Sequence, residues 1–367
     1  MARRQGYKRR ADPSTLPCHL GILHTKPSIQ IGYYHLCGLD RSLLSGTDFH
    51  GLDSVFEGAW IRLVRAVETA QLYGIGVLFG LFAIRFFAST SLTRLTDLHS
   101  APGKQNQDSH SGTSSPAVLF TIRSNLDLTV RALRTLLSAV RSLRSEHNPP
   151  ISNIIGIELL NEPKPSSHST LKDWYGKAIK QLRAVDSGLP LYISDCWMSD
   201  DYAHFVKSLP ESTAPICLDH HLYRCFTSED ISTPAAQHST SLMDPNAPTP
   251  QTFARVAGIL EDAGAALVVG EWSGALNPGS LQGPIDEREE RARYIAAQLA
   301  LYEQHCAGWF FWTYRKQYHG DQGWSFRDAV EAGVFPDCVG VYPKRNAPVH
   351  DPDRVGRKAA ALGRAIG

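Results

Sequence analysis

Short apolar runs alternate along this chain with longer segments in which apolar residues recur at helical spacing. The apolar runs predict seven strands, at 29–34, 74–79, 154–160, 189–194, 216–222, 265–270 and 308–313. The amphipathic segments predict helices at 55–73, 125–146, 169–185, 200–208, 250–264, 285–305 and 352–366. Because the predicted strands are almost continuously apolar, they indicate a parallel sheet that is buried on both faces.

The repeated strand–helix order over 367 residues favours a (β/α)8 barrel over an open, doubly wound sheet. No GxGxxG or GxxxxGK[ST] motif follows a predicted strand, so the sequence offers no support for nucleotide binding. The pattern is one strand short of eight, and only residues 20–24 could supply the first strand. We therefore expect an α/β barrel whose first strand is missing or irregular, with 1–28 as a basic irregular N-terminal segment and 29–367 as the barrel domain.

Composition narrows the classes of partner. The net charge of +1 gives no reason to expect nucleic acid, a membrane surface or an acidic partner. The seven cysteines are odd in number and lack CxxC spacing, which excludes a zinc pattern and a disulfide framework. The N-terminus is basic without an apolar segment, and the apolar stretch 74–88 is too short for a membrane span. We expect a cytoplasmic protein.

Polar and aromatic residues stand where the predicted strands end, which is where parallel barrels carry their chemistry. They come from several different strands, and the ones we select as candidates are His99, Asn161, Glu162, His221, Tyr223, Glu271 and Trp312. Taken singly, a glutamate after a strand is usually a solvated loop residue, a His-His pair is usually structural, and a tryptophan usually belongs to the core. Their coincidence at strand ends favours a site.

Two glutamates at the ends of different strands suit the cleavage of a glycosidic bond. One carboxylic acid must protonate the leaving oxygen while the other, ionised, attacks the anomeric carbon. Asn161 is placed to bind a sugar 2-hydroxyl, and Tyr223 to donate a hydrogen bond to the nucleophile. Trp312 offers a flat face for a pyranose ring.

Longer motifs resemble glycoside hydrolase family 5, within clan A, and most of all its fungal exo-β-1,3-glucanase (glucan 1,3-β-glucosidase) branch. The residues that carry the resemblance are IGYYHLCGLD (31–40), FEGAW (56–60), DLHSAPGKQN (97–106), GIELLNEP (156–163), LDHHLY (218–223), VVGEWSGALN (268–277), GWFFWTYR (308–315) and GWSFRDAVEAGVFP (323–336). The resemblance covers roughly residues 29–345. It implies that Glu162 is the acid/base and Glu271 the nucleophile, and that no metal or organic cofactor takes part. It also implies sugar-binding roles for His99, Asn161, His221, Tyr223 and Trp312.

The chain departs from the pattern of this family in three places. Residues 1–27 contain nothing like its Gly-Gly-Trp opening strand, and Ser28 stands where an arginine is usual near the nucleophile. Losing that cation would leave Glu271 less readily ionised. An apolar segment separates Phe79 from Asp97. We hypothesise that residues 80–96 are translated intron and 1–28 a mispredicted exon; the alternative is a genuine insertion.

These observations predict a retaining β-glucosidase or exo-β-1,3-glucanase that acts as a monomer on a β-glucoside or glucan oligosaccharide. A transglycosylase would use the same residues. The alternative from another class is a catalytically weakened or inactive carbohydrate-binding barrel. Residues 227–250 are polar and proline-rich. They form either a wall that closes one end of the cleft or a surface loop.

Overall fold

The computed structural model describes residues 28–33, 53–73, 75–81, 101–111 and 116–336. Within them, seven parallel strands form one sheet in the order β1 to β7. The strands are β1 (Ser28–Tyr33), β2 (Gly76–Leu81), β3 (Ile154–Glu158), β4 (Leu191–Ser194), β5 (Ile216–Leu222), β6 (Ala266–Trp272) and β7 (Trp309–Phe311). All seven predicted strands are confirmed, and at least one end is shifted in every one except β5. The candidate first strand at 20–24 and the predicted helix at 352–366 lie outside the described residues.

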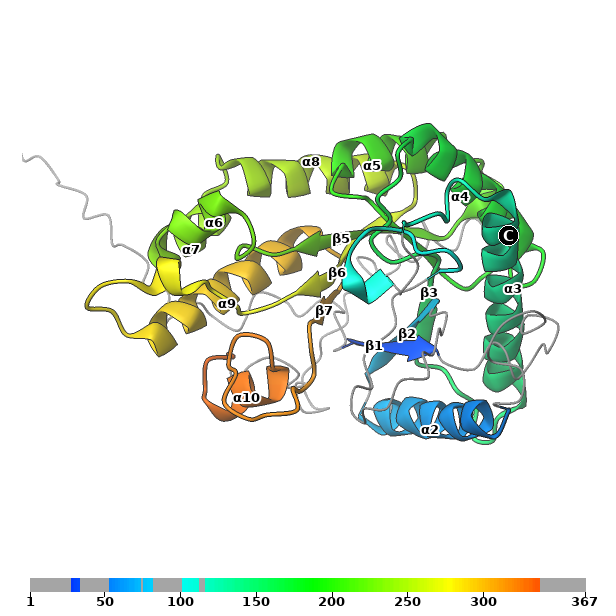
Figure 1. Cartoon of the computed structure of the whole chain (residues 1–367), viewed down its shortest axis with the longest axis horizontal. Helices are drawn as coiled ribbons and strands as arrows, with labels where there is room; N and C mark the ends of the chain where they lie inside the picture. The colour runs from blue at the N-terminus through cyan, green and yellow to red at the C-terminus, as the bar shows by residue number, and fades with distance from the viewer. Residues whose placement is uncertain (1–27, 34–52, 74, 82–100, 112–115, 337–367) are drawn as a thin grey trace, which may run out of the picture.

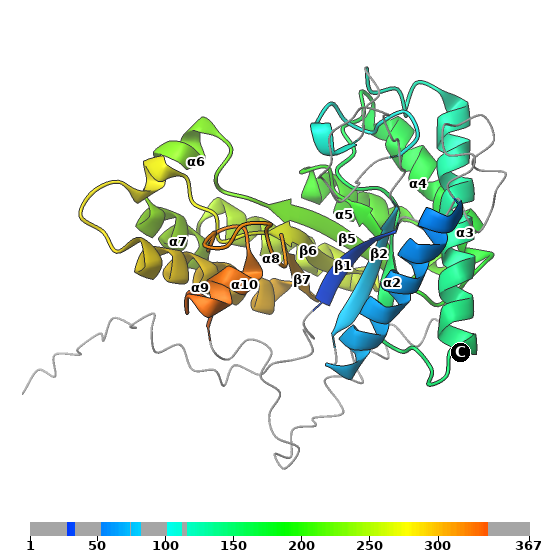
Figure 2. The same ribbon diagram turned by 60° about the horizontal axis from the view of Figure 1, so that its bottom comes forward.

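Helices flank the strands along the chain and lie around the outside of the curled sheet (Figure 1, Figure 2). They are α2 (Asp53–Leu72), α3 (Arg123–Glu146), α4 (His168–Arg183), α5 (Ser199–Ser208), α6 (Ser228–Ser232), α7 (Ala235–Met243), α8 (Pro248–Asp262), α9 (Glu287–His305) and α10 (Phe326–Glu331). Three short 3-10 turns complete the described elements: η3 (Ser109–Ser111), η4 (Glu211–Thr213) and η5 (Pro278–Leu281). This is the predicted α/β class with a curled parallel sheet.

The two faces of the sheet pack differently. Strand side chains alternate between the faces, so one face looks into the curl and the other toward the helices. The large core lies between sheet and helices, and a separate small cluster fills the inside of the curl. That inner cluster takes one buried side chain from each of five strands: Leu78, Tyr192, Cys217, Val268 and Phe310. The inside of the curl is therefore filled by side chains, so a substrate must bind at the ends of the strands.

Helix α9 supports the strand that carries Glu271. The helix begins at Glu287 because the Asp286 carboxylate accepts hydrogen bonds from the backbone N–H groups of Arg288 and Glu289. Further along, the fully buried Gln298 donates to the carbonyl of Ser273, at 3.0 Å. This contact ties the helix to the chain two residues beyond Glu271.

Residues 227–250 are largely helical, which the sequence pattern did not indicate. Thr227 and Asp230 form a capping box that starts α6, each side chain accepting from the other's backbone N–H. Helix α7 then buries Ala235 and Leu242. The segment is ordered by local capping and by the apolar side of α7.

Strand β2 extends into the segment that we interpreted as an insertion. Gly80 pairs with Gly32 and Glu158 of the neighbouring strands, and Leu81 pairs with Tyr33. The boundary at residue 80 thus falls within a paired strand, and residues 82–96 lie outside the described part.

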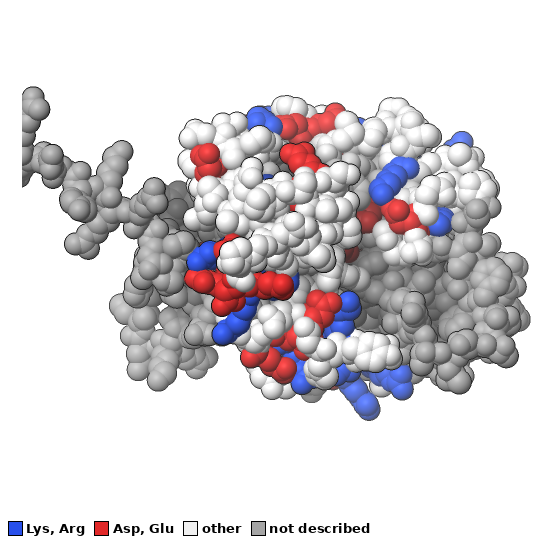
Figure 3. Space-filling model, turned by 60° about the vertical axis from the view of Figure 1, so that its left-hand side comes forward, with Lys and Arg blue, Asp and Glu red and all other residues white. Residues whose placement is uncertain are grey.

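The surface carries charges of both signs. On the face shown in Figure 3, acidic and basic side chains are interspersed among uncharged ones, as expected for a net charge of +1. Among the described helices, none combines the length and apolar character that crossing a membrane requires.

Candidate active site

The segment after β3 holds Glu162 at the rim of the sheet. Its backbone has a φ of +41°, a region that side-chain-bearing residues seldom occupy and that surrounding contacts must enforce. Those contacts come from the chain before α3. The Asn106 amide donates to the carbonyl of Glu162 at 2.8 Å, and the Gln105 amide donates to the carbonyl of Asn161 at 3.0 Å. The strained backbone is thereby fixed from a distant part of the sequence.

Two imidazoles contact the Glu162 carboxylate. Nδ1 of His221 lies 2.7 Å from Oε1, and Nε2 of His110 lies 3.2 Å from Oε2. Burial alone would raise the pKa of Glu162, but the hydrogen bonds from His110 and His221 outweigh it and hold that pKa well below its usual range. These contacts therefore favour the ionised form of the carboxyl.

Strand β5 supplies His221 and its second partner, Asp219. Nε2 of His221 lies 3.3 Å from Oδ2 of Asp219, and both side chains are buried. Burial lowers the pKa of the His221 ring, yet the charges of Glu271 and Asp219 raise it well above its usual range overall. The neighbouring carboxylates therefore favour the protonated form of the ring.

Glu271 lies on β6, where it is paired in register with His221. The phenol of Tyr223 donates to Oε2 of Glu271 at 2.8 Å, and Nδ1 of His221 is 3.7 Å from the same oxygen. Burial raises the pKa of Glu271 to about 7, against the lowering effects of the charge on His221 and the hydrogen bond from Tyr223. Near neutral pH this carboxyl is close to its titration midpoint.

The two glutamates meet at the rim. Carboxylate oxygens of Glu162 and Glu271 and a nitrogen of His221 lie within 4.8 Å of one another. Retaining glycosidases hold their two carboxyl groups about 5–5.5 Å apart, and inverting ones leave room for a water at about 6.5–9.5 Å. The close approach of these oxygens is compatible with the shorter of the two separations.

The remaining predicted residues have different outcomes. Asn161 is buried beside Glu162, and its side-chain oxygen has no hydrogen-bond partner in the described part of the chain. Trp312 is half-buried just past β7, where its backbone N–H donates to the carbonyl of Trp272 at 2.8 Å. His99 lies outside the described residues.

Several site residues were missed by the sequence reasoning. Gln105, Asn106 and Asp219 lie inside motifs that were recognised, but nothing in those motifs showed their contacts. No motif in the sequence pointed to His110 as a site residue, because it contacts Glu162, 52 positions away, only in the folded chain.

Aromatic rings around the site were missed as well. Trp197 is 45% exposed, and its indole N–H donates to the carbonyl of His221 at 3.1 Å. On the Glu271 side, the ring of Tyr223 packs against Phe226 and Trp324 at centroid distances of 5.4 and 5.5 Å. Through these contacts, the exposed ring of Trp197 lies next to His221 and that of Phe226 next to Tyr223. His221 and Tyr223 in turn contact the two carboxyl groups.

Of the three donor sets in the described residues that have the geometry to hold a metal ion, two lie at this site. They are Glu158, Asp219 and His221, and Glu162, His221 and Glu271. His221 belongs to both sets, and its raised pKa favours a proton over a metal on the ring. The donor chemistry therefore fits proton transfer better than metal binding.

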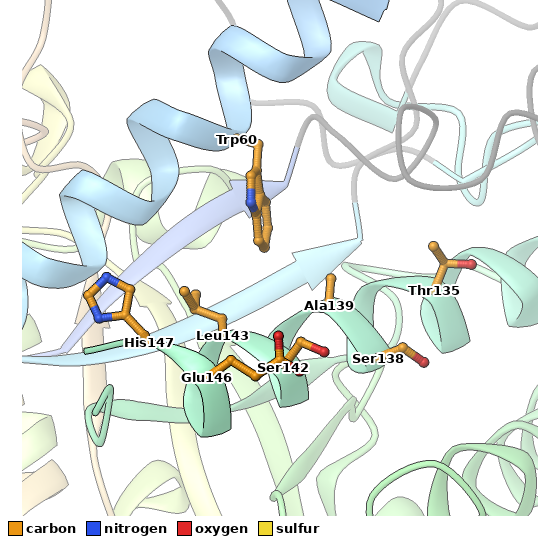
Figure 4. Close-up of a pocket in the computed structure, with 8 residues that line it drawn as sticks. All are labelled: Trp60, Thr135, Ser138, Ala139, Ser142, Leu143, Glu146 and His147. Atoms are coloured by element: carbon orange, nitrogen blue, oxygen red, sulfur yellow. The ribbon is translucent and has the colours of Figure 1, made fainter. Parts of the chain in front are cut away.

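A separate cavity of about 550 Å³ lies between α2 and α3. Figure 4 shows Trp60 projecting from α2 toward residues of α3 such as Ala139 and Ser142. The cavity is lined by residues of α2, of α3 and of the chain directly after α3, and neither Glu162 nor Glu271 is among them.

A parallel α/β barrel architecture with two facing carboxyl groups at its strand ends is the arrangement of glycoside hydrolases. The model of the family described as Cellulase (glycosyl hydrolase family 5) matches residues 144–317. A protein named "Glucan 1,3-beta-glucosidase 3" from Schizosaccharomyces pombe is 32% identical over 84% of this chain and 57% of its own length. A "Probable glucan 1,3-beta-glucosidase A" from Aspergillus fumigatus is 28% identical over 69% of this chain and 64% of its own length.

Among solved structures, rutinosidase from Aspergillus niger aligns with a TM-score of 0.52 at 13% identity, covering 86% of this chain and 98% of that one. This likeness concerns the fold. The chain belongs to glycosyl hydrolase family 5, as its motifs indicated. It spans a little over half the length of the first curated relatives that it matches.

Proposed function

We propose that this chain is a retaining glycoside hydrolase that cleaves β-glucosidic bonds, with Glu162 as general acid/base and Glu271 as nucleophile. The observation that carries the proposal is that one carboxylate oxygen of Glu162 and one of Glu271 lie within 4.8 Å of each other, just past the end of β3 and on β6. Inverting hydrolysis needs a wider gap.

In the first step, Glu162 passes a proton to the glycosidic oxygen as the bond to the anomeric carbon breaks and an oxygen of Glu271 bonds to that carbon. In the second step, Glu162 takes a proton from water, whose oxygen displaces Glu271. The buried oxygen of Asn161 accepts a hydrogen bond from a sugar hydroxyl, which gives that orphaned acceptor a partner.

The contacts of the two carboxyl groups favour the opposite arrangement of protons. Glu162 is ionised, and the pKa of Glu271 is raised to about 7. Nδ1 of His221 lies 2.7 Å from Glu162 and 3.7 Å from Glu271. The ring can hand its Nδ1 proton to Glu162 and receive one from Glu271, which conserves the number of protons and produces the reactive pair.

The proposed substrates are β-glucosides or β-1,3-glucan oligosaccharides. Two relatives carry the name glucan 1,3-beta-glucosidase, and the half-exposed ring of Trp197 and the exposed ring of Phe226 offer apolar faces of the kind that stack on pyranose rings.

Covalent labelling tests this function. The chain is incubated with 2,4-dinitrophenyl 2-deoxy-2-fluoro-β-glucoside, and the labelled peptide is identified by mass spectrometry. We expect one sugar on Glu271 in the wild type and none in Glu271→Gln. Glu290→Gln is the matched control, because Glu290 is also buried but lies on α9.

The stereochemistry of hydrolysis is followed by proton NMR in the same preparation. The β-anomer of glucose should appear first. Labelling of another residue, or first release of the α-anomer, would contradict double displacement, and complete absence of labelling would favour a barrel that binds carbohydrate without cleaving it.

A further inference from the structure

His221 has both ring nitrogens engaged in a place that water does not reach. Nδ1 faces Oε1 of Glu162 at 2.7 Å, and Nε2 faces Oδ2 of Asp219 at 3.3 Å. The ring is 3% exposed. Because each nitrogen has its own carboxylate, a change in either partner alters which nitrogen carries the proton.

The carboxylate of Asp219 is held in place by the backbone of the neighbouring strand β6. It is fully buried, and Oδ1 accepts a hydrogen bond from the backbone N–H of Gly270 at 2.6 Å. A Cβ added to Gly270 would lie 2.2 Å from both oxygens of that carboxylate. The carboxylate therefore rests on the backbone of the residue that precedes Glu271, and only glycine leaves room for it.

Charged and titratable groups surround the Asp219–His221 pair on every side. From the described strands and the loops that follow them these are Glu158, Glu162, Tyr192, Cys217, Tyr223 and Glu271, and His110 adjoins Glu162. Burial raises the pKa of Glu158, Tyr192 and Cys217. Among these groups, the Asp219 carboxylate is the one in contact with Nε2 of the ring, at 3.3 Å.

Building on the proposed function, we propose that Asp219 is a positioning residue: it keeps a proton on Nε2 of His221, so that Nδ1 and Glu162 share the single proton that reaches the leaving group. With Nε2–H fixed, Nδ1 either donates to the Glu162 carboxylate or accepts from its carboxylic acid. Both states contain one proton in that contact. When the glycosidic bond breaks, this proton moves to the leaving oxygen and Glu162 is left ionised, while the proton released by Glu271 returns to Nδ1 of His221.

The test uses Asp219→Asn in the full chain. Asparagine keeps the shape but can donate to Nε2, which permits the tautomer with its proton on Nδ1. In the Asp–His pair of serine proteases the same exchange costs about 10⁴-fold through the wrong tautomer, and general acid catalysis is worth about 10²–10⁴-fold. We expect kcat/KM for phenyl β-glucoside, whose leaving group needs a proton, to fall by about 10²–10⁴-fold.

A leaving group that needs no proton provides the contrast. For 2,4-dinitrophenyl β-glucoside, kcat/KM should fall by less than about tenfold, because its phenolate departs unaided. A merely structural role would depress both substrates alike, and that outcome overturns the proposal. Glu290→Gln should change neither substrate.

A second variant guards against misfolding of the first. Gly270→Ala retains the Asp219 charge but forces its carboxylate to shift, and it should give the same selective loss on phenyl β-glucoside. If it spares both substrates, the placement of Asp219 is irrelevant and the proposal fails.

A readout that needs no turnover separates this proposal from the function on which it rests. In protein with ¹⁵N-labelled histidine, the ring signals of His221 are assigned by their loss in His221→Asn. We expect a protonated Nε2 in the wild type and a different tautomer in Asp219→Asn. Identical ring signals in the two proteins overturn the role of Asp219, whereas a wild type that cleaves neither glucoside but shows this difference sinks only the proposed function.

Discussion

Replacing Glu271 by glutamine should stabilise the folded chain at neutral and alkaline pH. Burial raises the pKa of Glu271 from 4.5 to about 7. The folded state therefore holds this proton more tightly than the unfolded state does, and the wild type loses stability as the pH rises through that window. A shift of roughly 2.5 units corresponds to roughly 3 kcal/mol. Glutamine carries no charge to desolvate, so Glu271→Gln avoids this loss. The figure is an upper bound, because Glu271 also supports the charge on His221.

Urea unfolding followed by tryptophan fluorescence at about pH 4.5, 6 and 8 measures the effect. The free energy of unfolding of Glu271→Gln should match the wild type at the acid end and exceed it by up to about 3 kcal/mol at the alkaline end. A variant that is less stable than the wild type at about pH 8, or a gain that persists unchanged at acid pH, would refute the reasoning.

Glu162→Gln is the matched comparison and should have the opposite sign. The hydrogen bonds from His110 and His221 lower the pKa of Glu162, so its ionised form contributes stability above the unfolded pKa that is lost as the pH falls. Glutamine removes that contribution and leaves the imidazoles without their anion. We expect this variant to be less stable than the wild type at neutral pH, with the deficit shrinking toward acid.

Three further changes have distinct signatures. Asn106→Ala removes the donor to the Glu162 carbonyl, and it should cost about 1–3 kcal/mol in urea unfolding and lower kcat, because the strained backbone loses its support; an unchanged kcat would argue against that role. Tyr223→Phe removes the donor to Glu271, whose pKa should rise, so the acid limb of the kcat/KM profile should move to higher pH. Asp286→Ala removes the cap of α9 and should cost about 1 kcal/mol while leaving the pH profile in place.

The strands were predictable because burial on both faces favours apolar runs such as residues 216–218 at the start of β5, whose bounds agree with the prediction. The two glutamates were predictable as candidates for a related reason. A polar residue directly after a buried strand is conspicuous in sequence, and the barrel geometry fixes where that strand ends.

What the sequence did not reveal depends on contacts between distant segments. The pairing of His110 with Glu162 and the clamp of Asn106 on the Glu162 carbonyl require a loop that only the folded chain brings to β3. The conformation of the loop after β4 was not predictable for another reason. Cys196 and Trp197 both have positive φ values, of 51° and 57°, and neither residue is a glycine, which is the residue that usually indicates such a conformation.

The shifted pKa values at the site have one physical origin: Glu162, His221 and Glu271 are buried next to one another. Glu162 and Glu271 are both buried, yet their pKa values move in opposite directions, because among the described residues two imidazoles contact Glu162 and one stands near Glu271. The site thus separates two chemically identical side chains, as acid/base chemistry requires. A sugar whose binding brings a positively polarised anomeric carbon to Glu271 would favour ionisation of that carboxyl, and its proton has His221 as the nearest route to Glu162.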